Sequence, residues 1–458
     1  MGSFPPYNKI SSIERHLETL WAEHALPLSR AAQHNNSRKW FYGDTHYHSG
    51  YTNDVKEYGG TIPETRQAGR SIGLDWLVIT DHSVDLDEVD PGFSGKTRWQ
   101  RLKEELASPD ISNDQFRFIL GEEITLFGKD DRIVHMLAMG DMVDMVAGAF
   151  LPDNGGGFQA DLYRETIKKI VKAGEGYHPD TPKQLFGQLH SFESVLNMLP
   201  DGTLTFAAHP YDVAQIPPAE WDEGDMAHPD LTGHEFWNAR IRRKARMTDN
   251  PFIRSGWTKE AKLEQRDRGR IRTVRGQVSK KWDPHLQRGV DEWNANDELP
   301  TRRPVFIAGS DAHGDFNYHT GMAWDYSRLD MVDDNALGRV RTIVYLPDHQ
   351  GDLVPSTEKI LAALKKGTCI VTDGPILEFS IQGNGRRAHM GDVLNVSAND
   401  ELKMNIKAHT TPEFGPVAQV EVATYFKGQR KRSPYVTEVK AGKTETVKLN
   451  GPRGYCRV

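Results

Sequence analysis

Histidine and carboxylate residues recur in this sequence directly after short apolar runs. Side chains of these two types hold metal ions and move protons in proteins. The first case is the stretch 44–48, which follows the apolar run 40–42. Side chains two residues apart in a strand lie on one face, roughly 7 Å from each other, so we expect Asp44, His46 and His48 to share a face. Two imidazoles at that spacing can converge on one cation, although a strand with two surface histidines is the alternative for this motif alone.

The same pattern returns along the chain. Continuous apolar runs, which are typical of strands buried on both faces, end at polar residues near positions 81, 121, 209 and 311. One further histidine lies inside the apolar run 133–139. So many coincidences are hard to reconcile with surface decoration. The collected candidates are His46, His48, Asp81, His82, Glu123, His135, His209, Asp311 and His313.

Mixed imidazole and carboxylate ligands suit Zn, Mn or Fe and suit Ca poorly. The set exceeds the needs of one ion, so we expect two or three divalent ions that share bridging carboxylates. Without metal, burying so many polar groups would be costly. A site of this kind lowers the pKa of bound water to about 7 and stabilises a leaving oxygen, so the predicted reaction is hydrolysis.

Other catalytic motifs are weak or missing. The sequence has no Gly-x-Ser-x-Gly elbow of a serine hydrolase, and no Gly-x-Gly-x-x-Gly follows an apolar run. The stretch 92–97 resembles a phosphate-binding loop, but its glycines are too close together, so we interpret it as a turn.

The elements that must position these residues are alternating strands and helices. Apolar runs alternate with segments of helical periodicity, which predicts βα units in a parallel sheet or barrel. In such a barrel the carboxyl ends of the strands meet at one rim, where active sites are built. We expect strands at 40–48, 76–80, 116–120, 133–139, 204–208 and 302–308, and helices at 8–35, 63–71, 98–108, 161–173 and 191–199.

The pattern changes from about Leu377. Four runs, at 378–381, 402–407, 420–426 and 446–449, alternate with period two and are separated by Gly, Asn and Pro. This predicts a small antiparallel sheet or sandwich. The expected domains are an N-terminal helical segment at 1–40, a hydrolase barrel at 41–375 with a basic insertion at about 240–281, and a C-terminal β-sheet domain at 376–458.

The charge distribution bears on the partners. The net charge is −7, from 57 Lys and Arg against 64 Asp and Glu, which argues against nucleic acid as the main partner. The segment 240–281 is rich in Arg and Lys. It either covers the site and attracts an anionic small-molecule substrate, or forms a solvated arm or a subunit contact. An anionic substrate and a homo-oligomer both remain open.

Compartment is indicated by the cysteines and the N-terminus. Two cysteines, Cys369 and Cys456, make no disulfide framework and favour a reducing compartment. Residues 1–6 lack the basic and apolar pattern of a leader, and no apolar run is long enough to cross a bilayer. We therefore expect a cytoplasmic protein with no membrane partner, and secretion with a removed leader stays open.

Taken in order, five motifs resemble those of the PHP (polymerase and histidinol phosphatase) family of metal-dependent phosphoesterases. These motifs are Asp44-x-His46-x-His48, Thr80-Asp81-His82, Gly121-x-Glu123, His209-Pro210 and Ser310-Asp311-x-His313. The stretches 235–238, 341–345 and 364–375 are similar to one branch, the carbaryl-hydrolase-like (CehA/McbA) metallohydrolases. The resemblance spans about residues 41–395.

The resemblance implies an α/β fold, namely a distorted (β/α)7 PHP-type barrel that is followed by the small antiparallel β domain. It also implies ligand roles at the carboxyl rim. The first ion would be held by His46, His48, Glu123 and Asp311, the second by Glu123, His135 and His209, and the third by His82 and His313. Many family members carry one more histidine shortly after the first motif, and residues 49–54 contain none, so two or three ions are expected.

Further roles are expected around these ligands. Asp44 and Asp81 would orient imidazoles through their second ring nitrogen, and His234 and His319 would line the substrate pocket. The implied activity is hydrolysis by a metal-bridging hydroxide of phosphomono-, di- or triesters, or of aryl ester or carbamate bonds. His135, His209 or Asp81 would move the proton to the leaving group. The alternative is a non-catalytic, metal-bound scaffold or binding module.

Overall fold

The structure, a computed structural model, describes residues 39–52, 60–86, 89, 95–129, 133–140, 191–210, 221–238, 304–313, 337–338, 340–351, 353–372, 374–397, 400–409, 420–426, 435–437, 444–449 and 454–457. Several expected features lie outside these residues. They are the helices at 8–35 and 161–173, the basic insertion at 240–281, and His319.

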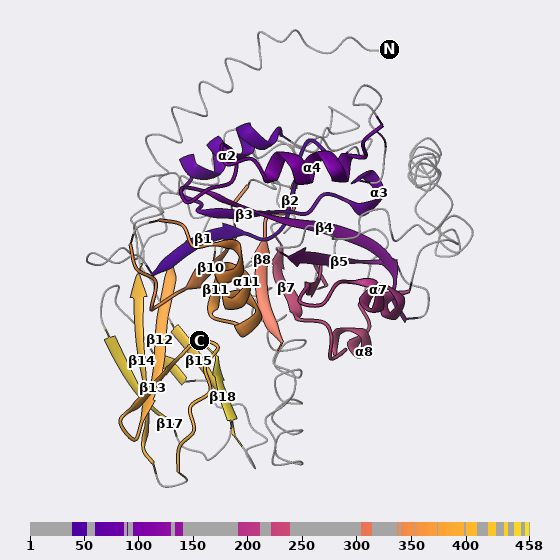
Figure 1. Cartoon of the computed structure of the whole chain (residues 1–458). Coiled ribbons are helices and arrows are strands. Elements are labelled where there is room, and N and C mark those ends of the chain that lie inside the picture. The colour runs from indigo at the N-terminus through magenta and orange to yellow at the C-terminus, as the bar shows by residue number, and fades with distance from the viewer. Residues whose placement is uncertain are drawn as a thin grey trace, which may run out of the picture.

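The main structural feature of the described residues is one mixed sheet of nine strands (Figure 1). It lies at the centre of the larger body, and its strands come from distant parts of the sequence. In spatial order they are β11 (Cys369–Thr372), β10 (Arg341–Tyr345), β1 (Trp40–Asp44), β3 (Trp76–Ile79), β4 (Arg117–Phe127), β5 (Ile133–Gly140), β6 (Leu204–Ala207), β7 (Gly233–Asn238) and β8 (Val305–Gly309).

The pairing directions agree only in part with the parallel sheet or barrel that the sequence predicts. β1 is parallel to β3, β3 to β4, β6 to β7 and β7 to β8. By contrast, β5 is antiparallel to β4 and β6, and β10 is antiparallel to β1 and β11. The connection from Phe127 to Ile133 is too short for the crossover that a parallel pair needs, so β4 and β5 form a hairpin. A regular (β/α)7 repeat is therefore not seen among the described elements.

The sheet is nearly closed, because its last strand β8 lies against β10 and β11 at the other end. Among the described strands, no continuous backbone ladder joins β8 to either of them. The Thr342 hydroxyl accepts a hydrogen bond from the Ala308 N–H (2.7 Å) and donates one to the Ala308 carbonyl (2.9 Å). The Cys369 thiol lies 3.7 Å from the Phe306 carbonyl. Side chains of β10 and β11 thus take the place of ladder bonds along this seam.

Helices cover the outer face of the sheet. The expected helices at 63–71, 98–108 and 191–199 are observed as α2 (Ile62–Ser71), α4 (Arg98–Leu106) and α7 (Phe192–Met198). α2 and α4 lie over β3 and β4, with the short α3 (Ser83–Leu86) beside them and α8 (Glu223–Met226) near α7 (Figure 1). α2, α4 and α7 each begin at a residue whose side chain accepts a hydrogen bond from the first turn. No helix in the described ranges is both long and apolar enough to span a bilayer.

A second apolar cluster fills one end of the barrel. Trp76, Val78 and Ile307 point to the inner face of the sheet and pack with Ile360 and Leu364 of α11 (Thr357–Lys366). α11 lies beside β8, β10 and β11 (Figure 1). Apolar side chains occupy the start of β3 and β8, so the polar residues that follow these two strands lie at their carboxyl ends.

The period-two runs after residue 376 form two antiparallel sheets, as expected. One contains β13 (Arg386–His389), β12 (Ile376–Gly383), β14 (Leu402–His409) and β17 (Thr444–Leu449); the other contains β16 (Tyr435–Thr437), β15 (Val420–Phe426) and β18 (Gly454–Arg457). Met404, Ile406 and Val422 are buried in a core of their own. These sheets form a separate small body below the barrel in Figure 1.

Candidate metal centre

The first motif does not lie on one continuous strand. β1 ends at Asp44, the chain bends at Thr45, and Tyr47–His48 form the short strand β2, which pairs with β9 (Ala312–His313). Because of this bend, the strict alternation of faces predicted for residues 44–48 does not hold.

The Asp44 carboxylate is used by backbone amides. It is fully buried and accepts hydrogen bonds from the N–H groups of His46 (3.1 Å), Ser310 (2.9 Å) and Gly338 (2.9 Å). Burial raises the pKa of Asp44 to about 6. The expected role of Asp44, orienting an imidazole ring, is therefore replaced by a role in holding three loop backbones together.

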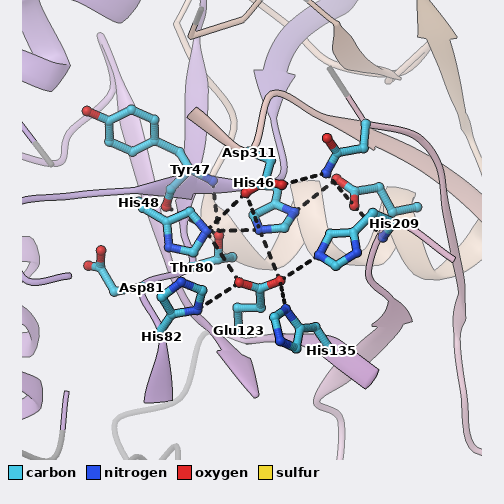
Figure 2. A network of polar contacts seen from close by, with 12 residues as sticks. His46, Tyr47, His48, Thr80, Asp81, His82, Glu123, His135, His209 and Asp311 are labelled. Atoms are coloured by element: carbon cyan, nitrogen blue, oxygen red, sulfur yellow. Dashed lines mark hydrogen bonds and ion pairs between the residues drawn. The ribbon is translucent and has the colours of Figure 1, made fainter. Parts of the chain in front are cut away.

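His46 and His48 nevertheless converge. Their Nε2 atoms lie 3.1 Å apart, and Asp311 Oδ1 lies 3.4 Å from the first and 3.3 Å from the second. All three side chains are buried. Residues from opposite ends of the barrel sequence therefore meet at one point, as Figure 2 shows.

Glu123 lies at the centre of the cluster (Figure 2). Its Oε1 atom is 2.9 Å from both His135 Nδ1 and His209 Nε2, and its Oε2 atom is 2.9 Å from His82 Nδ1. The sequence predicts that Glu123 follows the end of a strand, but β4 continues through Glu123 to Phe127. It faces the barrel interior, as Ile119 does four residues earlier.

Two overlapping groups have the donor set of a transition-metal site. The ligand atoms of His46, His48 and Glu123 lie within 4.8 Å of one another, and so do those of Glu123, His135 and His209. Both groups contain Glu123, so a carboxylate with two oxygens lies between them. Imidazole nitrogen and carboxylate oxygen together suit first-row divalent ions.

Hydrogen bonds to the other ring nitrogens test whether a cation fits. His46 Nδ1 lies 3.1 Å from Glu235 Oε1, and a carboxylate can only accept, so this nitrogen carries the proton. His48 Nδ1 lies 3.3 Å from Thr52 Oγ1, whose own proton is donated to Asp81 Oδ1 at 2.7 Å. The Nε2 atoms of His46 and His48 face each other at 3.1 Å, and with these tautomers either a proton on one of them or a cation between them satisfies both.

The electrostatics of the cluster favour positive charge. Burial alone would lower the pKa of His46, but the carboxylates of Glu235, Asp311 and Glu123 raise it well above its usual value. Burial would raise the pKa of Glu123, but His135, His46 and His82 hold it well below its usual value. In the absence of an ion, a proton on His46 supplies the positive charge that these carboxylates attract.

Two of the converging residues have strained backbones. His209 has φ 32° and Asp311 has φ 50°, values that non-glycine residues rarely adopt. Such conformations cost on the order of 1–3 kcal/mol each and persist only where the surroundings fix them. Here the His209 N–H donates to Glu235 Oε2 (2.7 Å) and the Asp311 N–H donates to the His46 carbonyl (2.8 Å).

Sequence reasoning missed three residues that contact the cluster. Glu235 and Asn238 lie in a stretch that was noted for its resemblance to one branch of the family, without any role for either side chain. Asn238 Nδ2 donates to both Glu235 Oε2 (3.2 Å) and Asp311 Oδ2 (3.0 Å). Thr52 links Asp81 to His48, so Asp81 acts on an imidazole through a hydroxyl. Apart from that resemblance, the stretch 233–238 (GHEFWN) contained no local signal that set Glu235 apart.

Other expected site residues lie elsewhere. His234 is on the opposite face of β7 from Glu235, where its Nε2 lies 3.0 Å from the Met226 carbonyl and its ring packs edge-on against Phe306. The structure thus places His234 in the outer packing layer and not among the clustered side chains. For His313 the structure describes the backbone, paired in register with His48, but not the side chain.

Comparison with known proteins adds little. No family model and no curated protein matches the chain. One similar solved structure is a two-domain protein containing a predicted PHP-like metal-dependent phosphoesterase from Bacteroides vulgatus, with 13% identity, a TM-score of 0.34 and coverage of 92% of each chain. Another is PsfC from Pseudomonas syringae, with 11% identity, a TM-score of 0.35 and coverage of 73% of this chain and 92% of that one. At such scores neither similarity supports a conclusion about fold or activity. Conclusions about the fold and the site rest on the geometry described above.

Proposed function

We propose that this protein is a metal-dependent hydrolase of the PHP type, which binds two divalent first-row cations and cleaves phosphoester bonds. The ions would be Mn, Zn or Fe, held by His46, His48, Glu123 and Asp311 on one side and by Glu123, His135 and His209 on the other. The proposal leaves a third position to His82 and His313.

The observation that carries the proposal is the environment of Glu123. A single buried carboxylate presents one oxygen to His135 and His209 and the other to His82. Burying so many ionisable groups together costs free energy unless charge is balanced. Two cations sharing this carboxylate would balance it.

Such ions, when bound, would lower the pKa of bound water to about 7 and polarise the ester under attack. The chain's own residues would orient the reactants. The exposed fraction of the side chain is 22% for His135 and 8% for His82, against 2% for His209 and 0% for His46 and His48. A substrate would therefore reach the cluster from the side of His135 and His82.

His135 is the clustered side chain that we place beside the leaving group, and Asp81 is not available for that role. Asp81 is fully buried, and its oxygens already accept hydrogen bonds from Ser49 and Thr52. Burial lowers the pKa of His135, so its ring is neutral near pH 7, with one nitrogen free to hold the second ion and a proton on the other nitrogen. Its ring is also the most exposed of the clustered imidazoles, so it can contact a leaving group.

The substrate class is part of the proposal. A phosphoester is preferred because two cations can stabilise both the attacking and the leaving oxygen of a displacement at phosphorus. Aryl esters and carbamates are the second choice, since the same groups would attack a carbonyl carbon. The natural substrate would be a small molecule, and an anionic one if the basic segment 240–281 covers the site.

The first experiment is elemental analysis of the purified protein, followed by assays with Mn, Zn or Fe supplied. Aryl phosphate mono-, di- and triesters are tested beside aryl carbamates and aryl esters. Two first-row ions per chain and turnover of at least one phosphate ester would support the proposal. Absence of bound metal, with no turnover of any compound, would contradict it.

A second experiment separates an enzyme from a metal-bound scaffold. In an enzyme, His46→Ala or Asp311→Ala lowers kcat by several orders of magnitude while circular dichroism shows the fold intact. A scaffold would lose metal with no rate to lose. Glu104→Gln, at an exposed ion pair with Lys96, is the surface control and should leave the rate unchanged.

A further inference from the structure

Three hydrogen-bond donors of the described residues face the Glu235 carboxylate. Its Oε1 atom lies 3.1 Å from the protonated Nδ1 of His46, and its Oε2 atom accepts from the His209 N–H (2.7 Å) and from Asn238 Nδ2 (3.2 Å). The residue is 1% exposed. One carboxylate therefore contacts two of the proposed ligands, on two different segments of the chain.

Asn238 extends this contact to a third ligand. Its Nδ2 group also donates to Asp311 Oδ2 at 3.0 Å, and Asp311 Oδ1 is the atom that faces His46 and His48. The amide lies between two carboxylates and gives one hydrogen bond to each. His46, His209 and Asp311 are thereby joined by one pair of side chains on β7.

We infer that Glu235 and Asn238 form a positioning pair, which sets His46, His209 and Asp311 in their ligand arrangement before any ion binds. The inference rests on the proposed metal binding and concerns residues that touch no ion themselves. It is carried by the hydrogen bonds above and by the positive φ angles of His209 and Asp311, which need such restraint.

The pair also controls the chemistry of His46. A carboxylate at Nδ1 requires the proton to be there, which leaves Nε2 free to bind a cation. In Glu235→Gln, a single carbonyl oxygen remains and an NH2 group replaces the second acceptor. If the NH2 faces His46, the proton moves to Nε2 and blocks the ligand atom; if it faces the other way, the His209 N–H loses its acceptor.

The test is the affinity of the full chain for Mn²⁺ or Zn²⁺, measured by competition with a chelator. We expect Glu235→Gln and Asn238→Leu each to weaken binding by about 10–100-fold, the usual effect of removing a partner behind a ligand. Binding at wild-type affinity in both variants would overturn the inference. If Glu235→Gln does not fold, Asn238→Leu carries the same comparison.

A matched control separates positioning from stability. Asp75 is a buried carboxylate whose Oδ2 accepts the Tyr42 N–H at 2.8 Å, at the opposite end of β3 from the cluster. We expect Asp75→Asn to lower the Tm of the metal-free protein and to leave the metal affinity unchanged. Equal loss of affinity in Asp75→Asn and Glu235→Gln would show a merely structural effect and overturn the inference.

A double variant tests whether the two residues act as one unit. Residues in one hydrogen-bond network show non-additive effects, so Glu235→Gln with Asn238→Leu should weaken binding little more than the worse single variant. Fully additive losses would count against a joint role. A wild-type chain that binds no ion overturns the proposed function as well, whereas wild-type affinity in the variants overturns only this inference.

Discussion

Gly309 of β8 passes so close to His46 that no side chain fits there. A Cβ at Gly309 would lie 2.2 Å from His46 Cβ and 2.8 Å from Glu235 Oε1. Non-bonded carbon atoms need about 3.5–4.0 Å, so in Gly309→Ala the two segments must separate by more than about 1 Å. This variant therefore displaces a proposed ligand without changing any polar group.

The expected cost follows from that displacement. Overpacking of a buried position costs about 1–3 kcal/mol, which lowers the Tm of a barrel of this size by several degrees. Metal sites tolerate ligand displacements of only about 0.2 Å, so we expect the affinity for Mn²⁺ or Zn²⁺ to fall by at least about 10-fold. Calorimetry and chelator competition measure the two effects on the same sample.

Gly69 provides the control. A Cβ at Gly69 in α2 would meet Phe116 Cζ at 2.9 Å in the outer packing layer, away from the cluster. Gly69→Ala should change the Tm and leave the metal affinity at the wild-type value. If Gly309→Ala binds metal as tightly as the wild type, β8 does not restrain His46 and the reasoning is wrong.

Three further predictions concern pH, a hydroxyl and the metal. Burial raises the pKa of Glu122 from 4.5 to about 8, so between these pH values the folded protein keeps a proton that the unfolded chain releases. The free energy of unfolding therefore falls as the pH rises through this range, by up to about 1.4 kcal/mol per pH unit. Glu122→Gln should remove this slope, which urea titrations of the metal-free protein measure. Thr52→Val removes the link from Asp81 to His48 and should weaken metal binding about 10-fold, which chelator competition measures; unchanged affinity would contradict the assigned tautomer. Chelation should lower the Tm by several degrees, because an ion present at 100 times its Kd stabilises the folded state by about 2.7 kcal/mol; an unchanged Tm would contradict metal binding.

Much of the arrangement is predictable from the sequence. Asp81 and His209 follow apolar runs, and the carboxyl ends of parallel strands in a barrel meet at one rim, so their placement on the same side of the barrel as His46 follows from strand geometry. The period-two runs after residue 376 likewise predict the antiparallel sheets that are observed. In each case a local pattern decides which face a side chain occupies.

Other features depend on contacts that no local pattern encodes. The bend at Thr45 turns Asp44 away from the imidazoles, and it depends on backbone amides of Ser310 and Gly338, far along the chain. The antiparallel direction of β5 places His135 at the site by a route that the strand-end rule does not cover. Glu235 has the same sequence signature as any buried carboxylate, so its partners become visible only in the assembled barrel.

The proposed ligands come from strands at both ends of the barrel sequence, and this has a consequence for folding. Cations joining His46 and Asp311 would act as a cross-link between the first strand and one of the last, much as a disulfide does in an extracellular domain. Each ion that binds the folded chain and not the unfolded chain would raise the free energy of unfolding. The amount of intact protein in a cell would then track the supply of the metal, and starvation for it would remove the protein along with its activity.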